Sequence, residues 1–270
     1  MTTQAEKGRL FRALHEREGA FVIPNPWDVG SARLLAQFGF EALATTSGGF
    51  AFSIAKPDGG VGRDAMMAHV ASIVSAVDLP VSGDLENGYG DAPEVAAETV
   101  RIAAASGLVG CSIEDATGNA DDPIYERSLA TDRIRAAVEA AGALPFPFTL
   151  TARCENFLHD RKDLEDTIQR LLAYQQAGAN VLYAPGLTRM EDIGAVVSAV
   201  ERPVNVLATA QLSVSRLAEI GVRRISVGSA LARAAYTALL NAAREIRDQG
   251  TFTYAAGTVS TRDFDAMFRL

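Results

Sequence analysis

The chain has 270 residues, of which 48% are hydrophobic and 21% charged, so it has enough apolar side chains for one large core and is not typical of a disordered protein. Its net charge of −8 argues against a general nucleic-acid binder and against binding to an anionic membrane surface. No apolar run reaches the ~20 residues of a membrane span, and the charged N-terminus is unlike a secretory signal. Only Cys111 and Cys154 occur, which indicates the reducing cytoplasm rather than a disulfide-stabilised secreted protein.

Short apolar runs rich in Val, Ile and Leu alternate with segments of helical periodicity along most of the chain. The apolar runs predict strands at residues 21–24, 42–45, 80–84, 108–114, 148–153, 180–184, 203–207 and 224–228. The other segments predict helices at residues 4–18, 30–38, 63–77, 93–105, 126–141, 163–177, 189–200, 213–220 and 229–248. The Gly- and Pro-containing stretch 50–62 predicts a loop.

Eight strand–helix units in about 250 residues predict an α/β fold of the closed (β/α)8 TIM-barrel type rather than an open doubly wound sheet. No Gly-x-Gly-x-x-Gly follows the first strand, which also argues against a dinucleotide-binding domain. We therefore expect a single domain over residues 1–270, with residues 229–270 as a C-terminal helical extension. The apolar tail at 264–270 is expected to pack on something, and a neighbouring subunit is one option.

The stretch after the third predicted strand places two carboxylates close together. Asp84 and Glu86 are two residues apart, so on an extended chain they point to the same side. Two such carboxylates repel each other unless a cation lies between them. A solvated acidic turn is the alternative explanation of this stretch.

Other predicted strands also end in polar residues, and in a barrel these ends meet at one mouth. They supply Asn25, Asp28, Thr46, Ser47, Glu114, Arg153, Glu155, Asn205, Gly228 and Ser229. Oxygen ligands without histidine clusters favour Mg²⁺, with Mn²⁺ as a substitute, over Zn²⁺. We therefore predict a metal site formed by Asp84, Glu86 and Glu114.

The period of two along a strand separates inward from outward side chains. If Asp84 points into the barrel, Leu85 points to the helices. The same rule turns Cys111 and Cys154 outward, where we expect small buried hydrophobes rather than nucleophiles. An inward Arg153 has two open interpretations, a structural counter-ion for the carboxylates or a partner for a substrate carboxylate or phosphonate.

The scarcity of lysine and histidine excludes one class of barrel enzyme. None of the three lysines falls on a predicted strand, so a Schiff-base aldolase is not expected. His15 and His69 fall in predicted helices, and His159, in the loop after the fifth strand, is expected to be a surface residue.

Several of these motifs occur in the order seen in a known group of proteins. Over about residues 20–235 the chain resembles the isocitrate lyase/phosphoenolpyruvate mutase superfamily. The resemblance lies in Asn25-Pro26-Trp27-Asp28 with Ser31-Ala32, Thr45-Thr46-Ser47-Gly48-Gly49, Asp84-Leu85-Glu86-Asn87-Gly88-Tyr89-Gly90, Ile113-Glu114-Asp115 and Ala152-Arg153. Members are Mg²⁺-dependent barrels whose last helix is exchanged between paired subunits, so the resemblance implies a helix-swapped homodimer or homotetramer.

The resemblance also implies a chemistry and a site. Members make or break a C–C or P–C bond next to the oxo group of a small 2-oxo acid, through an enolate-like state. The implied residues that hold Mg²⁺, directly or through water, are Asp58, Asp84, Glu86 and Glu114. The implied catalytic residues are Arg153, Glu114 and Asp58, and the implied substrate-binding residues are Thr45, Ser47, Gly48, Gly49, Arg153 and Asn205.

Two departures from the family pattern narrow the prediction. Asp84-x-Glu86 replaces the usual Asp-x-Asp pair, which keeps the charge and lengthens one arm. The loop at 116–125 lacks the Cys, Lys and His of the lyases, and its Asn119 matches only one of the two residue types used by the phosphonate-processing relatives. On position alone, the candidates for the missing acid are Tyr89, Tyr125 and Tyr183.

The combined prediction is a Mg²⁺-dependent lyase that cleaves a C–C bond in a small 2-oxo or 2-hydroxy dicarboxylic acid. A phosphonomutase or phosphonopyruvate hydrolase that acts on a P–C bond is one alternative. A barrel that binds a 2-oxo acid without catalysis is another, because the loop at 116–125 carries no recognised acid.

Overall fold

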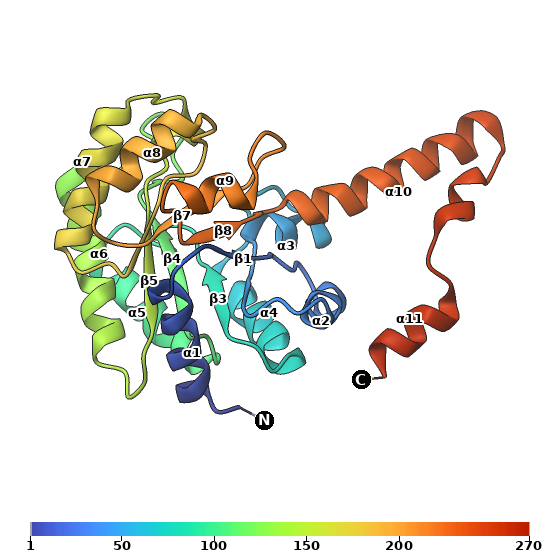
Figure 1. Ribbon diagram of the computed structural model, residues 1–270, viewed down its shortest axis with the longest axis horizontal. Coiled ribbons are helices and arrows are strands. Elements are labelled where there is room, and N and C mark those ends of the chain that lie inside the picture. Colours follow the sequence, from blue (N-terminus) through green and yellow to red (C-terminus); the bar gives the residue numbers. More distant parts are fainter. Residues whose placement is uncertain (1, 270) are drawn as a thin grey trace.

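The computed structural model describes residues 2–269, in which eight parallel strands stand inside a ring of helices (Figure 1). The strands are β1 (Phe21–Ile23), β2 (Leu43–Ala44), β3 (Val81–Asp84), β4 (Gly110–Glu114), β5 (Thr149–Arg153), β6 (Val181–Tyr183), β7 (Val204–Leu207) and β8 (Arg224–Ser226). Their order is β1-β8-β7-β6-β5-β4-β3-β2, with every ladder parallel. The predicted (β/α)8 barrel is confirmed.

The barrel closes less tightly between β1 and β2 than elsewhere. No ladder is assigned to this pair among the described residues, but the Ala44 N–H donates to the Pro24 carbonyl oxygen at 3.1 Å. Asn25 reinforces the seam, because its amide nitrogen donates to the Thr45 carbonyl. The Asn25 carbonyl oxygen accepts from the backbone N–H groups of Val227 and Gly228. One side chain therefore ties the ends of β1, β2 and β8 together at the mouth.

The helices follow the predicted segments, except that Ser47–Ser53 was not predicted as a helix and Thr261–Phe268 was predicted only as part of the C-terminal helical extension. They are α1 (Gln4–Glu16), α2 (Val29–Gln37), α3 (Ser47–Ser53), α4 (Arg63–Ala76), α5 (Pro93–Ala105), α6 (Arg127–Gly142), α7 (Leu164–Gln176), α8 (Met190–Ala199), α9 (Val214–Glu219), α10 (Ala230–Gln249) and α11 (Thr261–Phe268), with 3-10 turns at Asn156–His159 and Thr253–Gly257. Side-chain caps fix several starts; Asp28 and Ser31, for example, form a reciprocal capping box at α2.

The expected loop at 50–62 is wrong in its first part, because α3 extends to Ser53. The Thr46 side chain caps this helix by accepting from the Gly49 N–H. Gly49 also packs where no side chain would fit, since a Cβ there would lie 3.0 Å from Trp27 and 3.3 Å from Ala232. The two adjacent glycines therefore do not form a turn; they allow a short helix to pack closely against its neighbours.

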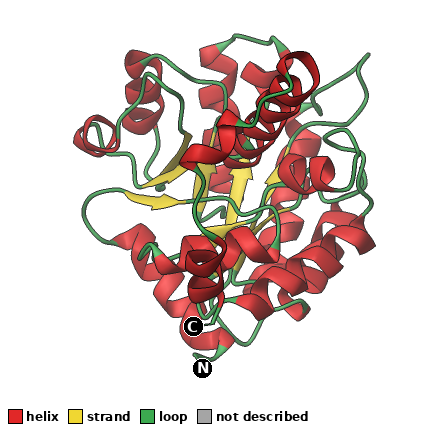
Figure 2. Cartoon of the chain, turned by 90° about the vertical axis from the view of Figure 1, so that its right-hand side faces the viewer, coloured by secondary structure: helices red, strands yellow, loops and turns green. Residues whose placement is uncertain are grey.

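The strands sort their side chains as the alternation predicts. Leu85, Cys111 and Cys154 are buried in the layer between sheet and helices, and both cysteines are free thiols. The barrel interior is instead polar, with buried Thr151 and Arg224. Figure 2, turned by 90°, shows the strands at the centre with helices around them.

The last segments leave the barrel as an arm. In Figure 1, α10 extends away from the body and the chain returns through α11, which lies near α2. Gln37 donates to the Met267 carbonyl at this contact. Large apolar side chains of the arm are exposed, namely Leu239, Leu240, Ile246, Phe252, Tyr254, Val259, Phe264 and Phe268. Within residues 2–269, no helix is long and apolar enough to cross a bilayer.

Candidate active site

Two neighbouring cavities open at the carboxyl ends of the strands. The first, of about 160 Å³, descends into the barrel, and the second, of about 570 Å³, lies under the loops that follow β3, β4 and β5. Both are lined by Ser47, Asp58, Arg153 and Leu158. The predicted polar strand ends therefore gather around one site, with Arg153 where the two cavities meet.

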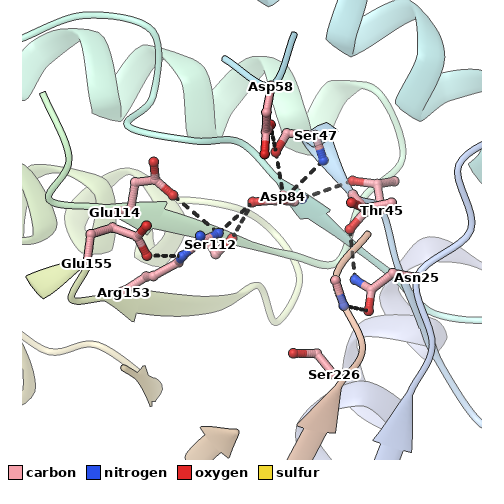
Figure 3. Close-up of polar contacts among 12 residues, drawn as sticks. Asn25, Thr45, Ser47, Asp58, Asp84, Ser112, Glu114, Arg153, Glu155 and Ser226 are labelled. Carbon is pink, nitrogen blue, oxygen red and sulfur yellow. Dashed lines mark hydrogen bonds and ion pairs between the residues drawn. The ribbon is translucent and has the colours of Figure 1, made fainter. Parts of the chain in front are cut away.

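Asp84 is held by groups on β4 and β5, by Thr45 directly after β2, and by Ser47 at the start of α3 (Figure 3). Its backbone N–H donates to the Thr45 hydroxyl at 2.9 Å, and its Oδ2 accepts from the backbone N–H and the hydroxyl of Ser47, both at 3.0 Å. Its Oδ1 accepts from Ser112 at 3.3 Å and from Arg153 at 3.4 Å. Neutral and charged donors thus fix this carboxylate at the mouth.

Arg153 is surrounded by carboxylates. Its Nη1 lies 3.2 Å from Glu114 and 3.4 Å from Asp84, and its Nε pairs with Glu155. Burial disfavours the Arg153 charge, but these carboxylates outweigh burial and raise the pKa of Arg153 well above its usual value. Burial raises the pKa values of Glu114 and Glu155, and the positive charge of Arg153 offsets only part of this increase.

Glu155 is itself placed by a buried network that sequence reasoning did not assign to the site. The Glu155 N–H donates to Asp115 Oδ1 at 2.7 Å. The other Asp115 oxygen accepts from Tyr174 at 2.6 Å and from Arg170 at 3.2 Å. The only sequence signal was the placement of Glu155 after a strand end, because the partners of Asp115 lie on α7.

Glu86 and Asp58 both line the second cavity. Glu86 has a left-handed backbone (φ 50°), as do Gly88 and Tyr89 after it, so the chain turns sharply away from the strand. Its Oε1 is buried without a protein partner. Burial, followed by repulsion from Asp84 and Asp58, raises the pKa of Glu86 to about 7. Burial and Asp84 also raise the pKa of Asp58.

This donor set fits a hydrated divalent cation. Among residues 2–269, no group of three or more Asp, Glu, His or Cys side chains has a geometry that would bind a metal ion directly. Mg²⁺, however, keeps several waters and binds through one or two carboxylates. The unpartnered Glu86 oxygen and the raised pKa values of Asp58 and Glu86 indicate negative charge that a cation between them would stabilise.

The residues expected to bind substrate do not all face the cavity equally. Ser47 and Gly48 line it, and a Cβ on Gly48 would lie 2.7 Å from an Asp58 oxygen, so a side chain there would displace the Asp58 carboxylate. Thr45 lines the cavity but its hydroxyl accepts from the backbone of Asp84. Gly49 packs away from the cavity, against α10.

Asn205 lies deeper in the barrel and is almost fully buried. Its amide nitrogen donates to Ser226 at 3.0 Å and its carbonyl oxygen accepts from Arg224 at 2.9 Å. These two partners also line the first cavity, as does Tyr183. Arg224 and Ser226 were missed because the prediction followed strand ends, although the alternation on β8 points both inward.

The three tyrosines differ in position. Tyr125 donates to Asp91 at 2.6 Å, and it lines neither of the two cavities. Tyr183 lines the first cavity, and burial raises its pKa to about 12. Tyr89 lines the second cavity, where its hydroxyl is buried without a protein partner, and burial followed by the charge of Glu86 raises its pKa.

The loop at 116–125 is a tight structure that presents no ionisable group to the cavities. Ala116 pairs with Ile124 as an antiparallel bridge, and the Thr117 N–H donates to the Pro123 carbonyl. Ala116 and Gly118 line the second cavity, whereas Asn119 accepts from the Asp121 N–H within the loop. His159 is exposed at the rim of the second cavity. His15 and His69 are buried.

A parallel (β/α)8 barrel with a polar cavity at the carboxyl-terminal ends of its strands has the architecture and site position that are typical of TIM-barrel enzymes. Comparison with known families gives the particular group. The phosphoenolpyruvate phosphomutase family model matches residues 11–247, and the chain belongs to this family.

Three relatives show the range of the family. A Mycobacterium tuberculosis (strain H37Rv) protein without an assigned activity is 32% identical over 88% of this chain and 89% of its own length. Oxaloacetate decarboxylase of Pseudomonas aeruginosa is 30% identical over 88% of this chain and 84% of its own. The 2-methylisocitrate lyase of Escherichia coli K12 is 27% identical over 95% and 90% of the two chains.

Solved structures agree with this assignment. A candidate lyase/mutase from Burkholderia cenocepacia J2315 superposes with a TM-score of 0.97 at 61% identity, over 99% of this chain and 98% of that chain. Oxaloacetate acetylhydrolase with the product oxalate superposes with a TM-score of 0.88 at 25% identity, over 100% and 96% of the two chains. The superfamily comprises lyases and mutases that act on small acids.

Proposed function

We propose that this protein is a Mg²⁺-dependent lyase that cleaves a C–C bond next to the oxo or carboxylate group of a small 2-oxo or 2-hydroxy dicarboxylic acid. The observation that carries the proposal is the position of Arg153 among Asp84, Glu114 and Glu155 at the mouth of the barrel. Cleavage beside a carbonyl leaves an electron pair that delocalises onto an oxygen as an enolate. A preorganised guanidinium is suited to stabilise that developing charge.

Each part of the site has a role in this proposal. Asp84, Glu86 and Glu114, with Asp58, would hold Mg²⁺ partly through water, and the ion would act as a Lewis acid on the substrate oxygens. Arg153 donates hydrogen bonds to the oxygen that gains charge. Ser47 and Gly48 form the side of the cavity against which the substrate carboxylate lies.

The proton required after bond cleavage is assigned to Tyr89. Its hydroxyl is buried without a protein partner in the cavity that Glu86 and Glu114 also line. A phenol is protonated at neutral pH, and the position of this hydroxyl in the cavity allows it to donate a hydrogen bond to the substrate and then the proton. The loop at 116–125 presents no competing acid to either cavity.

The experiment is an NMR assay of the protein with Mg²⁺ and a panel of oxaloacetate, 2-methylisocitrate, 2,3-dimethylmalate and phosphonopyruvate. Turnover of a C–C substrate supports the lyase, and turnover of phosphonopyruvate alone supports the P–C alternative. Binding of the panel without turnover supports the non-catalytic barrel. An Asp84→Ala protein, which lacks the central carboxylate, is the control for activity from a contaminant.

The exposed apolar arm supports an oligomer in which α10 and α11 pack on a second subunit. Leu239 and Phe252 are more than 60% exposed, and such a series of large apolar side chains is costly in water. The expected state is a homodimer or homotetramer in the cytoplasm. Light scattering at micromolar concentration tests it, and a mass of 28.6 kDa, that of one chain, would contradict it.

A further inference from the structure

Arg224 is a buried charge without a counter-ion. It is 4% exposed at the start of β8, and its side chain points into the barrel. Its Nε donates to the Asn205 carbonyl oxygen at 2.9 Å, but its Nη1 has no partner among the described residues. No carboxylate of residues 2–269 forms an ion pair with Arg224. The buried ion pairs in this part of the chain belong to Arg153 and Arg170.

Such an arrangement is energetically unfavourable unless something else provides the negative charge. An unpaired ion in a protein interior carries a desolvation penalty of several kcal/mol even after relaxation. Burial lowers the pKa of Arg224 to about 10, so the guanidinium is still protonated at neutral pH. The nearby His15 supplies no negative charge in either of its protonation states, and burial, followed by the Arg224 charge, lowers its pKa to about 3.

The position of Arg224 connects it with the proposed reaction site. It lines the lower part of the same cavity of about 160 Å³ whose upper part is lined by Asp84, Ser47 and Arg153. Ser226, beside it on β8, also lines this cavity, and Figure 3 shows it apart from the carboxylate cluster. One cavity therefore has a negatively charged group of side chains at its mouth and an unpaired positive charge at its floor.

Resting on the proposed function, we infer that Arg224 is the subsite for the second anionic group of the substrate. The 2-oxo or 2-hydroxy acid end lies at the mouth, and a carboxylate at the far end of the molecule descends to the Nη1 of Arg224. A carboxylate supplies both the missing hydrogen-bond acceptor and the missing charge. The selected substrates are therefore dicarboxylates, and a monocarboxylate of the same length leaves Arg224 unpaired.

The test is titration calorimetry with Mg²⁺ and three probes, on the wild type and Arg224→Met. Malate and 2-hydroxybutanoate have the same chain length and differ in the far carboxylate, and oxalate reports on the mouth alone. We expect the wild type to bind malate about tenfold to a hundredfold more tightly than 2-hydroxybutanoate, since a charged hydrogen bond contributes about 1.5–3 kcal/mol. Arg224→Met should bring the two within twofold and leave oxalate binding unchanged within twofold.

The outcomes separate this inference from the proposed function. A malate preference that persists in Arg224→Met, with oxalate binding intact, overturns the subsite and leaves the proposed function standing. Failure of the wild type to bind oxalate with Mg²⁺ overturns both. Arg224→Lys, which keeps the charge, should retain most of the preference. The melting temperature of Arg224→Met should be no lower than that of the wild type, because the substitution removes an unpaired charge. A marked decrease would show that the protein itself stabilises the Arg224 charge, and it would overturn the inference.

Discussion

Two arginines in the same barrel have opposite surroundings. Arg153, at the mouth, lies against Asp84, Glu114 and Glu155, and its charge is more than balanced by the protein. Arg224, at the floor, has one neutral acceptor in Asn205 and no carboxylate. The mouth therefore carries excess negative charge and the floor excess positive charge. A site with this polarity is suited to a cation at one end and an anion at the other.

The difference also shows which arginine the fold needs. Removing a carboxylate from around Arg153 leaves a buried network partly unpaired, which destabilises the protein. Removing the Arg224 charge leaves no carboxylate without a partner among residues 2–269. We therefore expect variants at the mouth to affect both catalysis and stability, whereas variants at the floor affect the choice of ligand.

The largest expected effect is at Asp84. Asp84→Ala removes the carboxylate to which Ser47, Ser112 and Arg153 all donate. We expect Mg²⁺ binding by calorimetry to be lost and kcat/KM to fall by about a thousandfold or more, as when a group central to transition-state stabilisation is removed. Asp121→Ala, on the exposed loop, is the matched control. Unchanged Mg²⁺ binding in Asp84→Ala would mean that the metal site is wrongly assigned.

The next effect is at Arg153. Arg153→Lys keeps one charge but cannot reach Asp84, Glu114 and Glu155 together, because lysine lacks the planar fork of arginine. We expect kcat to fall by about a hundredfold with a smaller change in KM, since the contact strengthens in the transition state. Arg189→Lys, on the surface, should behave as the wild type. Full activity of Arg153→Lys would leave Arg153 as a structural counter-ion only.

A smaller effect is expected at Tyr89. Tyr89→Phe removes only the hydroxyl, which has no protein partner, so the fold should be unaffected. We expect kcat to fall by about tenfold to a hundredfold, within the range for a general acid. Tyr125→Phe is the matched control, because Tyr125 donates to Asp91 outside both cavities. A larger loss in Tyr125→Phe than in Tyr89→Phe would reverse the assignment of the proton donor.

A further prediction concerns Glu155, which orients Arg153 at the mouth of the barrel. Glu155→Gln keeps the shape of the side chain but removes the charge that pairs with the Nε of Arg153. We expect kcat to fall by about tenfold, because the guanidinium loses one of its orienting partners. Thermal stability is expected to fall as well, since Glu155 is buried. A kcat equal to that of the wild type would separate Glu155 from catalysis.

The smallest expected effect is a pH dependence of folding stability that comes from His15, which lies near Arg224. The pKa of His15 is about 3 in the folded protein against 6.5 unfolded, so below pH 6.5 the unfolded chain binds the proton and the folded chain does not. Stability is therefore complete above pH 6.5 and is lost as the pH falls towards 3. At pH 5.5 the loss from this one group is about 1.4 kcal/mol.

Urea unfolding at pH 7.5 and 5.5 measures this loss. His15→Leu should show a pH dependence smaller by roughly that amount, whereas His159→Gln, at an exposed position, should match the wild type. An identical pH dependence in His15→Leu and the wild type would mean that the His15 ring takes up a proton in the folded protein.

Much of the fold follows from the sequence because alternating short apolar runs and helical segments leave few possible topologies. The strand parity also predicted that Leu85, Cys111 and Cys154 would face the helices. The start of α3 was not predictable in the same way, because Gly48–Gly49 indicates a turn unless the tertiary packing against Trp27 is known. Local propensity is decisive only where tertiary contacts do not compete with it.

The site was predicted to a lesser degree. The sequence places Asp84 and Glu114 at strand ends and Glu86 just after one, and such positions are polar in many barrels. The roles of Thr45 and Ser47 as donors to Asp84 depend on distances between strands that no spacing in the sequence reports. Arg224 was missed because the prediction followed strand ends and Arg224 starts β8; that its Nη1 lacks a partner is visible only in the structure.

The base of the arm has a consequence for enzyme assays. Ala232, in the first turn of α10, lies against Gly49 of α3, and α3 also carries Ser47 and Gly48 at the cavity. A shift of α10 therefore changes the packing of the helix that lines the cavity. If a second chain fixes α10, dilution below the dissociation constant of the oligomer lowers the specific activity, which then depends on the protein concentration.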